Sequence, residues 1–492
     1  MKKLKELLSD TLIYGISSVL ARFIGYLLVP LHTDVFLTSE YGIVSLVYAA
    51  LAFLNVVFSM GMESAYLRYA KNREDAKDFF KTLQLGLGGI CTILVFVLIL
   101  LAPVLMPTMN LGATGNQNLY WMMLGILWFD AMVLVPFAEL RLVRRPWLFA
   151  ALKTGNIIVN VGLQFYLILE LGWGIEAIFS ASLIASGLTT IVILLVTADM
   201  FAGSWHTPLF KKALKFGLPF IPAGLGHAIN ETLDRFFLGN YMSQATVTEL
   251  YGPQNTPDDI VGIYGACYKL SVFMLLLVQM FRMAWQPFFL RHSDDEKAPE
   301  LFRDVFRYFN VIASFAFLSV ALFAQKIVQI KIPGLDFYLI GQEFWSGLQI
   351  VPILLGAYWF QGWYMNFSAG IFIKEETKVL PQITLIGAAV TVVANLVLIP
   401  QYGMIGSATA TLISYATMAF LLYFRSVRMY PVSYELGRGI GMIVIAALCL
   451  VMQSHVINWI GSEWTANLLL LLIGTILFLL LGYRRGATTI SE

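Results

Sequence analysis

The chain contains fourteen apolar stretches, each long enough to cross a lipid bilayer as an α-helix. About 20 predominantly apolar residues span the hydrocarbon core, and a single segment can satisfy its backbone there only as a helix. The stretches cover residues 11–31, 41–63, 82–103, 119–140, 147–169, 175–198, 216–239, 261–284, 306–325, 346–370, 381–400, 404–424, 439–457 and 465–483. The sequence therefore predicts an all-α integral membrane protein with no room for a sizeable soluble domain.

The composition supports this class. Of the 492 residues, 59% are hydrophobic and 13% are charged, whereas roughly 25% of a soluble protein is charged. The net charge of +2 lacks the basic excess of nucleic-acid-binding proteins, so we expect membrane lipids and no nucleic acid as partners. The three cysteines, Cys91, Cys267 and Cys449, lie in apolar stretches, where a thiol behaves as a small hydrophobe. We expect neither a disulfide, nor a metal site, nor a cofactor.

The distribution of Lys and Arg between the loops predicts that both termini are cytoplasmic. If the first stretch starts inside, 25 of the 32 Lys and Arg residues fall in cytoplasmic segments, and two, Lys326 and Lys331, fall in external loops. Cytoplasmic loops of inner-membrane proteins are enriched in these residues. An error of one span would invert every later loop, so the count favours fourteen spans in the bacterial inner membrane.

The first six stretches resemble the next six at an offset of about 220 residues; for example, Gly42 in Tyr-Gly-Ile aligns with Gly262 in Val-Gly-Ile. Because six is even, both copies enter the membrane from the same side, and the repeat is parallel. Chance similarity between apolar helices is the alternative. We expect two six-helix bundles in pseudo-two-fold parallel repeat, residues 1–205 and 206–428, plus two extra C-terminal helices in 429–492. This body plan is common in alternating-access transporters.

Several cations fall within the predicted spans, where a charge costs at least about 2.5–3.5 kcal/mol. Arg22 lies in the middle of the first span and Lys269 lies deep in the eighth. Lys153 and Arg282 lie nearer the cytoplasmic ends of their spans, so they either snorkel to the interface or face a cavity. Cations at several depths predict an electropositive cavity that suits an anionic group such as a phosphate.

The seventh span adds a cluster of opposite charges. Glu231 and Arg235 are one helical turn apart, and Asp234 lies on nearly the same face. One interpretation is that these side chains neutralise one another structurally, and the other is that they belong to a site.

Three further motifs have a structural interpretation. The aromatic residues of 358–364 lie in mid-span, where packing between helices is favoured over stacking against sugar rings. The glycines of 437–441 open a membrane helix, where small residues allow close packing. Asp258 and Asp259 lie in the longest external loop, far from any nucleotide supply, and do not indicate a metal site. The chain also lacks a G-x-x-x-x-G-K-[ST] phosphate-binding loop, and we expect it not to be an enzyme.

Motifs along the whole chain resemble polysaccharide flippases of the multidrug/oligosaccharidyl-lipid/polysaccharide exporter superfamily. They are Phe216-Gly217-Leu218-Pro219-Phe220-Ile221-Pro222, Asp234-Arg235, Val261-Gly262-Ile263-Tyr264, Tyr268-Lys269, and Asn395 to Tyr402-Gly403 continuing to Gly406-Ser407-Ala408-Thr409-Ala410-Thr411. Ser407 stands where the family usually has Ala. The motifs are specific for the superfamily and much less so for the substrate.

The resemblance implies a flippase for undecaprenyl-diphosphate-linked oligosaccharide, such as an O-antigen unit of lipopolysaccharide or a capsule unit. It implies a cationic central cavity, in which Arg22, Arg235 and Lys269 are the candidates for binding the diphosphate or acidic sugars, with Lys153 and Arg282 as further candidates. Lipid-linked oligosaccharide and a polysaccharide polymerase would then be its partners.

Some relatives couple transport to Na+ or H+ through the second bundle. Here Glu231, Asp234, Asn395 and Thr409 supply suitable oxygen ligands. A buried hydrogen-bond network that joins the three helices is the alternative.

Other functions remain open at this point. A peptidoglycan-lipid flippase or a drug antiporter of the same superfamily is the runner-up, although drug export favours acidic rather than cationic cavities. A membrane polysaccharide polymerase or ligase is the alternative from another class. It would need a large external loop or clustered catalytic side chains, and neither is evident in the sequence.

Overall fold

The computed structural model describes residues 28–70, 75–112 and 115–483. Within these ranges the chain is helical, without strands apart from one isolated bridge between Lys331 and Tyr338. Ten of the described helices are long and apolar enough to cross a membrane. The predicted all-α membrane class is confirmed.

The chain forms two compact units that divide between Gly265 and Ala266. The helices of the first unit are α2 (Leu28–Val35), α3 (Thr38–Ser59), α4 (Met62–Tyr69), α5 (Ala76–Thr108), α6 (Gln117–Met132), α7 (Leu134–Leu142), α8 (Pro146–Phe165), α9 (Glu176–Val196), α10 (Thr207–Gly217), α11 (Phe220–Tyr241) and α12 (Gln244–Tyr251). Helix α13 (Pro257–Arg291) runs across the division. The second unit continues with α14 (Ala298–Val328), α15 (Val351–Ile373), α16 (Val379–Met429), α17 (Leu436–Ile460) and α18 (Glu463–Gly482). Short π- and 3-10 segments cover Tyr166–Glu170, Ala198–Ala202 and Gln342–Ile350.

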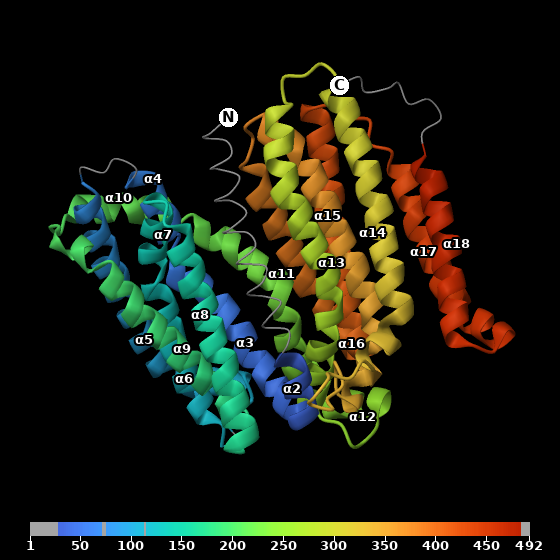
Figure 1. Ribbon diagram of the computed structural model, residues 1–492, viewed down its shortest axis with the longest axis horizontal. Coiled ribbons are helices and arrows are strands. Elements are labelled where there is room, and N and C mark those ends of the chain that lie inside the picture. Colours follow the sequence, from blue (N-terminus) through green and yellow to red (C-terminus); the bar gives the residue numbers. More distant parts are fainter. Residues whose placement is uncertain (1–27, 71–74, 113–114, 484–492) are drawn as a thin grey trace. The chain divides into compact units, whose positions relative to one another are not determined.

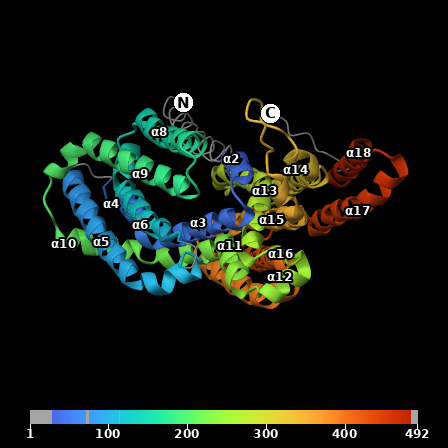
Figure 2. The ribbon, with the colours of Figure 1, turned by 90° about the horizontal axis from the view of Figure 1, so that it is seen from below.

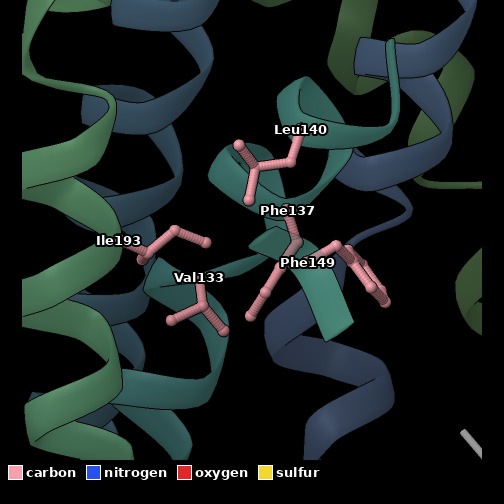
Figure 3. Packing of buried hydrophobic residues seen from close by; sticks show 5 residues of the cluster. All are labelled: Val133, Phe137, Leu140, Phe149 and Ile193. Atoms are coloured by element: carbon pink, nitrogen blue, oxygen red, sulfur yellow. The ribbon is translucent and has the colours of Figure 1, made fainter. Parts of the chain in front are cut away.

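In the first unit, α9 packs against both α6 and α8, and α6 also packs against α3 and α5 (Figure 1, Figure 2). A cluster of buried apolar side chains joins α7 to its neighbours: Val133, Phe137 and Leu140 meet Phe149 of α8 and Ile193 of α9 (Figure 3). The Phe137 and Phe149 ring centroids are 5.1 Å apart in an edge-to-face arrangement, which aromatic pairs favour. This cluster fixes the start of α8 relative to α7 and α9.

The predicted span 119–140 is broken between α6 and α7. Pro136 has no backbone N–H and so cannot bond the carbonyl of Met132 four residues earlier. The side chain of Gln84 on α5 compensates, because its Nε2 donates to that carbonyl at 2.9 Å. The break is therefore stabilised by a side chain distant in sequence.

Helix α16 holds two predicted spans, 381–400 and 404–424, rather than one. Its 51 residues would extend for about 76 Å if straight, more than twice the hydrocarbon thickness. The chain turns back at Gly403, where φ is 53° and ψ is −125°. The two halves then lie side by side, because Ser407 Oγ donates to Asn395 Oδ1 at 3.0 Å and Ser414 Oγ donates to the Gly387 carbonyl at 2.9 Å.

Helices α3 and α13 cross at two glycines, which have no Cβ. A Cβ on Gly42 would overlap the carbonyl oxygen of Asp258, and a Cβ on Gly262 would overlap the carbonyl oxygen of Thr38. The two contacts are reciprocal, because Thr38 precedes Gly42 by four residues, as Asp258 precedes Gly262. Only glycine allows so close an approach of the two backbones.

Asp258 and Asp259 lie in the first turn of α13 rather than in the predicted loop, which itself contains α12. Asn110 Nδ2 donates to Asp258 Oδ1 at 2.5 Å, and the hydroxyl of Thr38 donates to Asp259 Oδ1. Asp259 also accepts from the backbone N–H of Thr256 at 2.8 Å. Both carboxylates therefore act as hydrogen-bond acceptors that secure the start of α13.

The aromatic residues of 358–364 are packed between helices in the second unit. Trp359 and Trp363 are buried, and their indole N–H groups donate to the same atom, Asn310 Oδ1, at 2.9 and 2.7 Å. Gly439 lies against the ring of Trp363. The predicted packing roles of the aromatic run and of the glycine run at Gly439 are confirmed.

Helices α17 and α18 pack against each other and against α14 (Figure 1, Figure 2). Gln453 Nε2 and Asn467 Nδ2 both donate to the Leu322 carbonyl, at 3.1 and 2.8 Å. Lys326 Nζ lies 2.6 Å from Glu463 Oε2. The last helix pair is therefore held to α14 by polar contacts as well as by apolar packing.

Candidate functional site

The first unit contains a cavity of about 810 Å³ between α3, α4, α6, α7, α8 and α9. Its size is within the usual range for small-molecule sites. Unusually for a membrane bundle, many of its lining residues are polar: Tyr48, Asn55, Ser59, Glu63, Asp130, Arg141, Lys153, Asn156, Asn160, Ser182 and Ser186. Polar and ionisable groups in such a position normally serve a function.

Helix α8 supplies one wall. Lys153, Asn156, Asn160 and Gln164 are spaced by three, four and four residues, which places them on one face of the helix. Asn156 Nδ2 donates to Thr189 Oγ1 at 2.9 Å, and Asn160 Nδ2 donates to Ser182 Oγ at 3.0 Å. The polar face of α8 is thus held against the hydroxyl groups of α9.

Gln164 extends this network away from Lys153. Its Nε2 donates to Asn160 Oδ1, and its Oε1 accepts from Nε2 of the buried His32 at 2.7 Å. From Lys153 to Gln164 the helix rises about 16 Å, roughly half of the hydrocarbon core. Asn160 still lines the cavity, so the polar track extends about one helical turn beyond it, to Gln164 and His32.

Asp130 and Lys153 are opposite charges that both line the cavity. Asp130 on α6 is half-buried, and its Oδ1 accepts from Ser186 Oγ at 2.8 Å. The Lys153 ammonium lies 4.4 Å above the ring of Phe137, a distance typical of a cation–π contact. Both residues also line a smaller pocket of about 60 Å³ with Asn156. The carboxylate and the ammonium therefore face a common space.

Another opposite-charge pair lines the same cavity. Arg141 of α7 and Glu63 of α4 form an ion pair. The buried Glu139, also on α7, accepts from Tyr66 Oη at 2.9 Å. Arg141 is thus engaged by a carboxylate, whereas the ammonium of Lys153 lies over an aromatic ring.

The structure distributes the predicted cations between the two units. Arg22 lies outside the described residues. Lys153 lines the cavity of the first unit. Lys269, half-buried, and Arg282, exposed, lie on the part of α13 that belongs to the second unit. Of the predicted cations in the described residues, Lys153 is therefore the one that lines this cavity.

Arg235 is bound by its own helix. Its Nη1 lies 3.0 Å from Asp234 Oδ1 and donates to the Glu231 carbonyl oxygen at 2.6 Å. Asp234 is buried and also accepts from Tyr264 Oη at 2.8 Å. The ion pair favours mutual neutralisation of Asp234 and Arg235, whereas the contact with Glu231 is made through its backbone carbonyl.

The predicted coupling residues fall into both units. Glu231 and Asp234 belong to the first unit, whereas Asn395 and Thr409 lie on the two halves of α16 in the second. Asn395 is buried, accepts from Ser407 and donates to the Thr391 carbonyl at 2.7 Å. Thr409 is half-buried. Asn395 thus belongs to a hydrogen-bond network within α16, and the four-residue ion site stays a prediction.

Sequence reasoning missed the residues that surround Lys153: Asp130, Asn156, Asn160 and Ser186. The helical spacing of Lys153, Asn156 and Asn160 was a usable signal, because it places three polar groups on one face of a membrane span. Asp130 is a single polar residue in an apolar stretch, and its neighbours become evident only when α6, α8 and α9 are packed together.

Residues 7–293 match a family described as polysaccharide biosynthesis protein. The chain belongs to this family. No curated protein sequence gives a significant match. Membership in the family agrees with the motifs that indicated a polysaccharide exporter.

Solved structures with the same fold are transporters. The lipid II flippase MurJ, in an inward closed conformation, matches with a TM-score of 0.71 at 17% identity, over 96% of this chain and 98% of that chain. An inward-facing multidrug resistance MATE family transporter of the MOP superfamily matches with a TM-score of 0.61 at 15% identity, over 85% and 97%. A variant of the Vibrio cholerae MATE transporter VcmN matches with a TM-score of 0.52 at 17% identity, over 86% and 97%. Together with the family match, this fold confirms the resemblance read from the sequence and a multi-pass membrane protein.

Proposed function

We propose that the protein flips undecaprenyl-diphosphate-linked oligosaccharide across the bacterial inner membrane, by alternating access, for the synthesis of a surface polysaccharide. The observation that carries the proposal is the family match over residues 7–293. The fold supports transport rather than enzymatic chemistry, because the matching solved structures are a flippase and transporters.

The polar cavity of the first unit supports an anionic, glycosylated substrate. Amide and hydroxyl groups such as those of Asn156, Asn160 and Ser182 bind sugar hydroxyls, and the ammonium of Lys153 suits a phosphate. In this proposal Lys153 contacts the head group, and Arg22, Arg235, Lys269 and Arg282 remain candidates for the rest of a cationic path. A polysaccharide polymerase that receives the flipped substrate is the proposed protein partner.

We propose that the chain crosses the membrane fourteen times. The ten apolar helices count α16 once, although its two halves turn back on each other at Gly403. Helices α11 and α15, of 22 and 23 residues, and the stretch 11–31 supply the remaining three spans. The 25-to-2 distribution of Lys and Arg supports cytoplasmic termini and the inner membrane.

The reciprocal glycine contact supports the proposed duplication, with bundles in 1–205 and 206–428 followed by the extra pair of 429–492. Thr38 and Gly42 meet Gly262 and Asp258 across the crossing of α3 and α13. The residues that exchange roles differ by 220 positions, the offset found in the sequence. A contact of a segment with its own equivalent is typical of a two-fold axis.

Coupling to Na+ or H+ remains part of the proposal. Glu231 and Asp234 would supply carboxylates, and Asn395 and Thr409 would supply neutral oxygens. Any coupling ion must bind one access state more tightly than the other, because equal affinity shifts no population.

A peptidoglycan-lipid flippase is the second candidate, because the fold match to the lipid II flippase MurJ covers 96% of the chain. Genetic complementation separates the two. We expect the protein to restore surface polysaccharide in a strain that lacks its O-antigen or capsule flippase, and not to sustain a strain that lacks its lipid II flippase. The opposite pattern would reverse the assignment.

The same assay tests the cations. We expect Lys153→Gln, Lys269→Ala and Arg22→Ala each to abolish polysaccharide export at normal membrane levels, because each removes a charge that binds the diphosphate. Lys331→Gln is the matched control, since Lys331 lies in a short loop segment and pairs with the exposed Asp336. Normal export by all three variants, at equal membrane levels, would contradict a cationic substrate path.

A further inference from the structure

We infer that Lys153 is shared between Asp130 and the anionic head group of the substrate, so that binding of the head group makes Asp130 take up a proton. This inference rests on the proposed function and adds to it a proton-binding residue in the first bundle. Neither Asp130 nor a proton site on α6 follows from the sequence motifs, which point to the second bundle for coupling.

The charged side chains of Asp130 and Lys153 line the same cavity. Asp130 on α6 and Lys153 on α8 line the cavity of about 810 Å³ and the pocket of about 60 Å³. Asp130 accepts a hydrogen bond from Ser186 at 2.8 Å, and the Lys153 ammonium lies over the ring of Phe137. The charge of Lys153 acts on Asp130, and Lys153 is also exposed, so a ligand that enters the cavity can reach it.

The other ionisable groups that line the cavity do not supply a second cation for the head group. Helices α4 and α7 supply Glu63 and Arg141, which form an ion pair with each other. Helix α3 supplies Tyr48, and α9 supplies the neutral Ser182 and Ser186. The described residues that line the cavity include two cations, Arg141 and Lys153. Arg141 is paired with Glu63, and Lys153 is not.

When Lys153 changes its partner from Asp130 to the phosphate, a proton on Asp130 replaces the lost positive charge. Without a head group, the Lys153 ammonium is the cation whose charge acts on the Asp130 carboxylate. A phosphate that binds the ammonium brings negative charge toward Asp130 and takes over its counter-charge, and both effects favour the protonated carboxyl group. One proton then passes from solution to a carboxylate oxygen of Asp130, and no covalent bond to the substrate forms or breaks.

Linkage fixes the sign of the pH dependence. If binding of the head group is accompanied by proton uptake, protons and head group promote each other's binding equally. Affinity for the head group must therefore rise as the pH falls and weaken as the pH rises.

The experiment uses the purified full-length protein in detergent and uridine diphosphate N-acetylglucosamine, a soluble diphosphate-sugar whose diphosphate does not titrate near neutral pH. Calorimetry in buffers of different ionisation enthalpy measures affinity and proton uptake together. For the wild type we expect uptake approaching one proton per molecule bound. Asp130→Asn should abolish the uptake and tighten binding roughly tenfold, because the competitor for Lys153 is gone.

Three further variants make the result specific. Lys153→Arg should retain binding and uptake, and Lys153→Gln should lose binding. Ser186→Ala removes a hydrogen bond to the charged form of Asp130, so the pH dependence should move to higher pH; this variant also tests the inference if Asp130→Asn does not fold. Asp336→Asn is the matched control, because its side chain is 85% exposed in a loop segment outside the cavity.

The outcomes separate the inference from the proposed function. Binding without proton uptake, or uptake that persists in Asp130→Asn, would overturn the inference and leave the flippase proposal intact. Absence of binding to the wild type would also overturn it, whereas the flippase proposal is decided by complementation. Uptake that depends on Asp130, with tighter binding by Asp130→Asn, would support it.

Discussion

Asp234 is a buried carboxylate whose partners come from its own helix and from α13. It accepts from Tyr264 at 2.8 Å and lies 3.0 Å from the Arg235 guanidinium. Removing one member of a buried pair leaves an uncompensated charge, which costs more than removing both. The pair therefore explains why two charges are tolerated in the middle of α11.

We expect Arg235→Ala to destabilise the protein by roughly 3 kcal/mol, and the double variant Arg235→Ala with Asp234→Ala to recover part of that loss. Thermal unfolding in detergent measures both. If the two single effects simply add in the double variant, the guanidinium and the carboxylate are not coupled, and Arg235 is available for substrate.

Asn310 is a second residue whose role depends on its partners. It is the common acceptor for the Trp359 and Trp363 indoles. We expect Asn310→Ala to lower stability by about 2–6 kcal/mol, because each of the two buried donors that lose their partner costs about 1–3 kcal/mol. Unfolding followed by Trp fluorescence measures the loss. In a protein that also carries Trp359→Phe and Trp363→Phe, Asn310→Ala should lower the free energy of unfolding by clearly less. An equal loss there would contradict this role.

Among single residues, the sequence predicted the charge cluster of α11 but not the partners of Lys153. Arg235 and Asp234 are adjacent in the chain, so their pairing could be foreseen. Asp130, Ser186 and Lys153 lie on three different helices, and no local pattern brings them together. Long-range packing decides which of the intramembrane charges line a common cavity.

At the level of elements, hydropathy predicted the apolar spans well, because a membrane helix needs a long apolar run whatever its neighbours are. The turn between the two halves of α16 was foreseen near Gly403. The break before α7 was not, because it depends on Pro136 and on the distant side chain of Gln84, which bonds the freed Met132 carbonyl. The start of α13 was placed too late, because Asp258 and Asp259 secure an additional turn.

The crossing of α3 and α13 leads to a prediction about elements. Gly42→Ala or Gly262→Ala would drive a Cβ into a backbone carbonyl of the other helix, so each should lower the melting temperature and reduce the folded yield. Gly89→Ala on α5 is the control, because a Cβ there would have no neighbour within 4 Å, and Ala is the better helix former. Equal stability of Gly42→Ala and Gly89→Ala would contradict the close approach of the two backbones.

For the molecule as a whole, alternating access requires some contacts to open as others close. The proposed topology places the crossing of α3 and α13, with its Thr38–Asp259 hydrogen bond, on the external side. We expect a thiol crosslink between Thr38→Cys and Asp259→Cys to block polysaccharide export and its reduction to restore it. The three native cysteines are buried and do not interfere. Undiminished export by the crosslinked protein would show that this crossing stays closed throughout transport.

The central proposal is tested most directly by reconstitution. The purified protein is placed in liposomes with fluorescent undecaprenyl-diphosphate-oligosaccharide, and the fraction that reaches the outer leaflet is measured with and without imposed Na+ and H+ gradients. We expect flipping that needs the protein, is lost in Lys153→Gln, and responds to at least one gradient. Flipping that is indifferent to both gradients would remove the coupling proposal, and a rate equal to that of protein-free liposomes would contradict the flippase function itself.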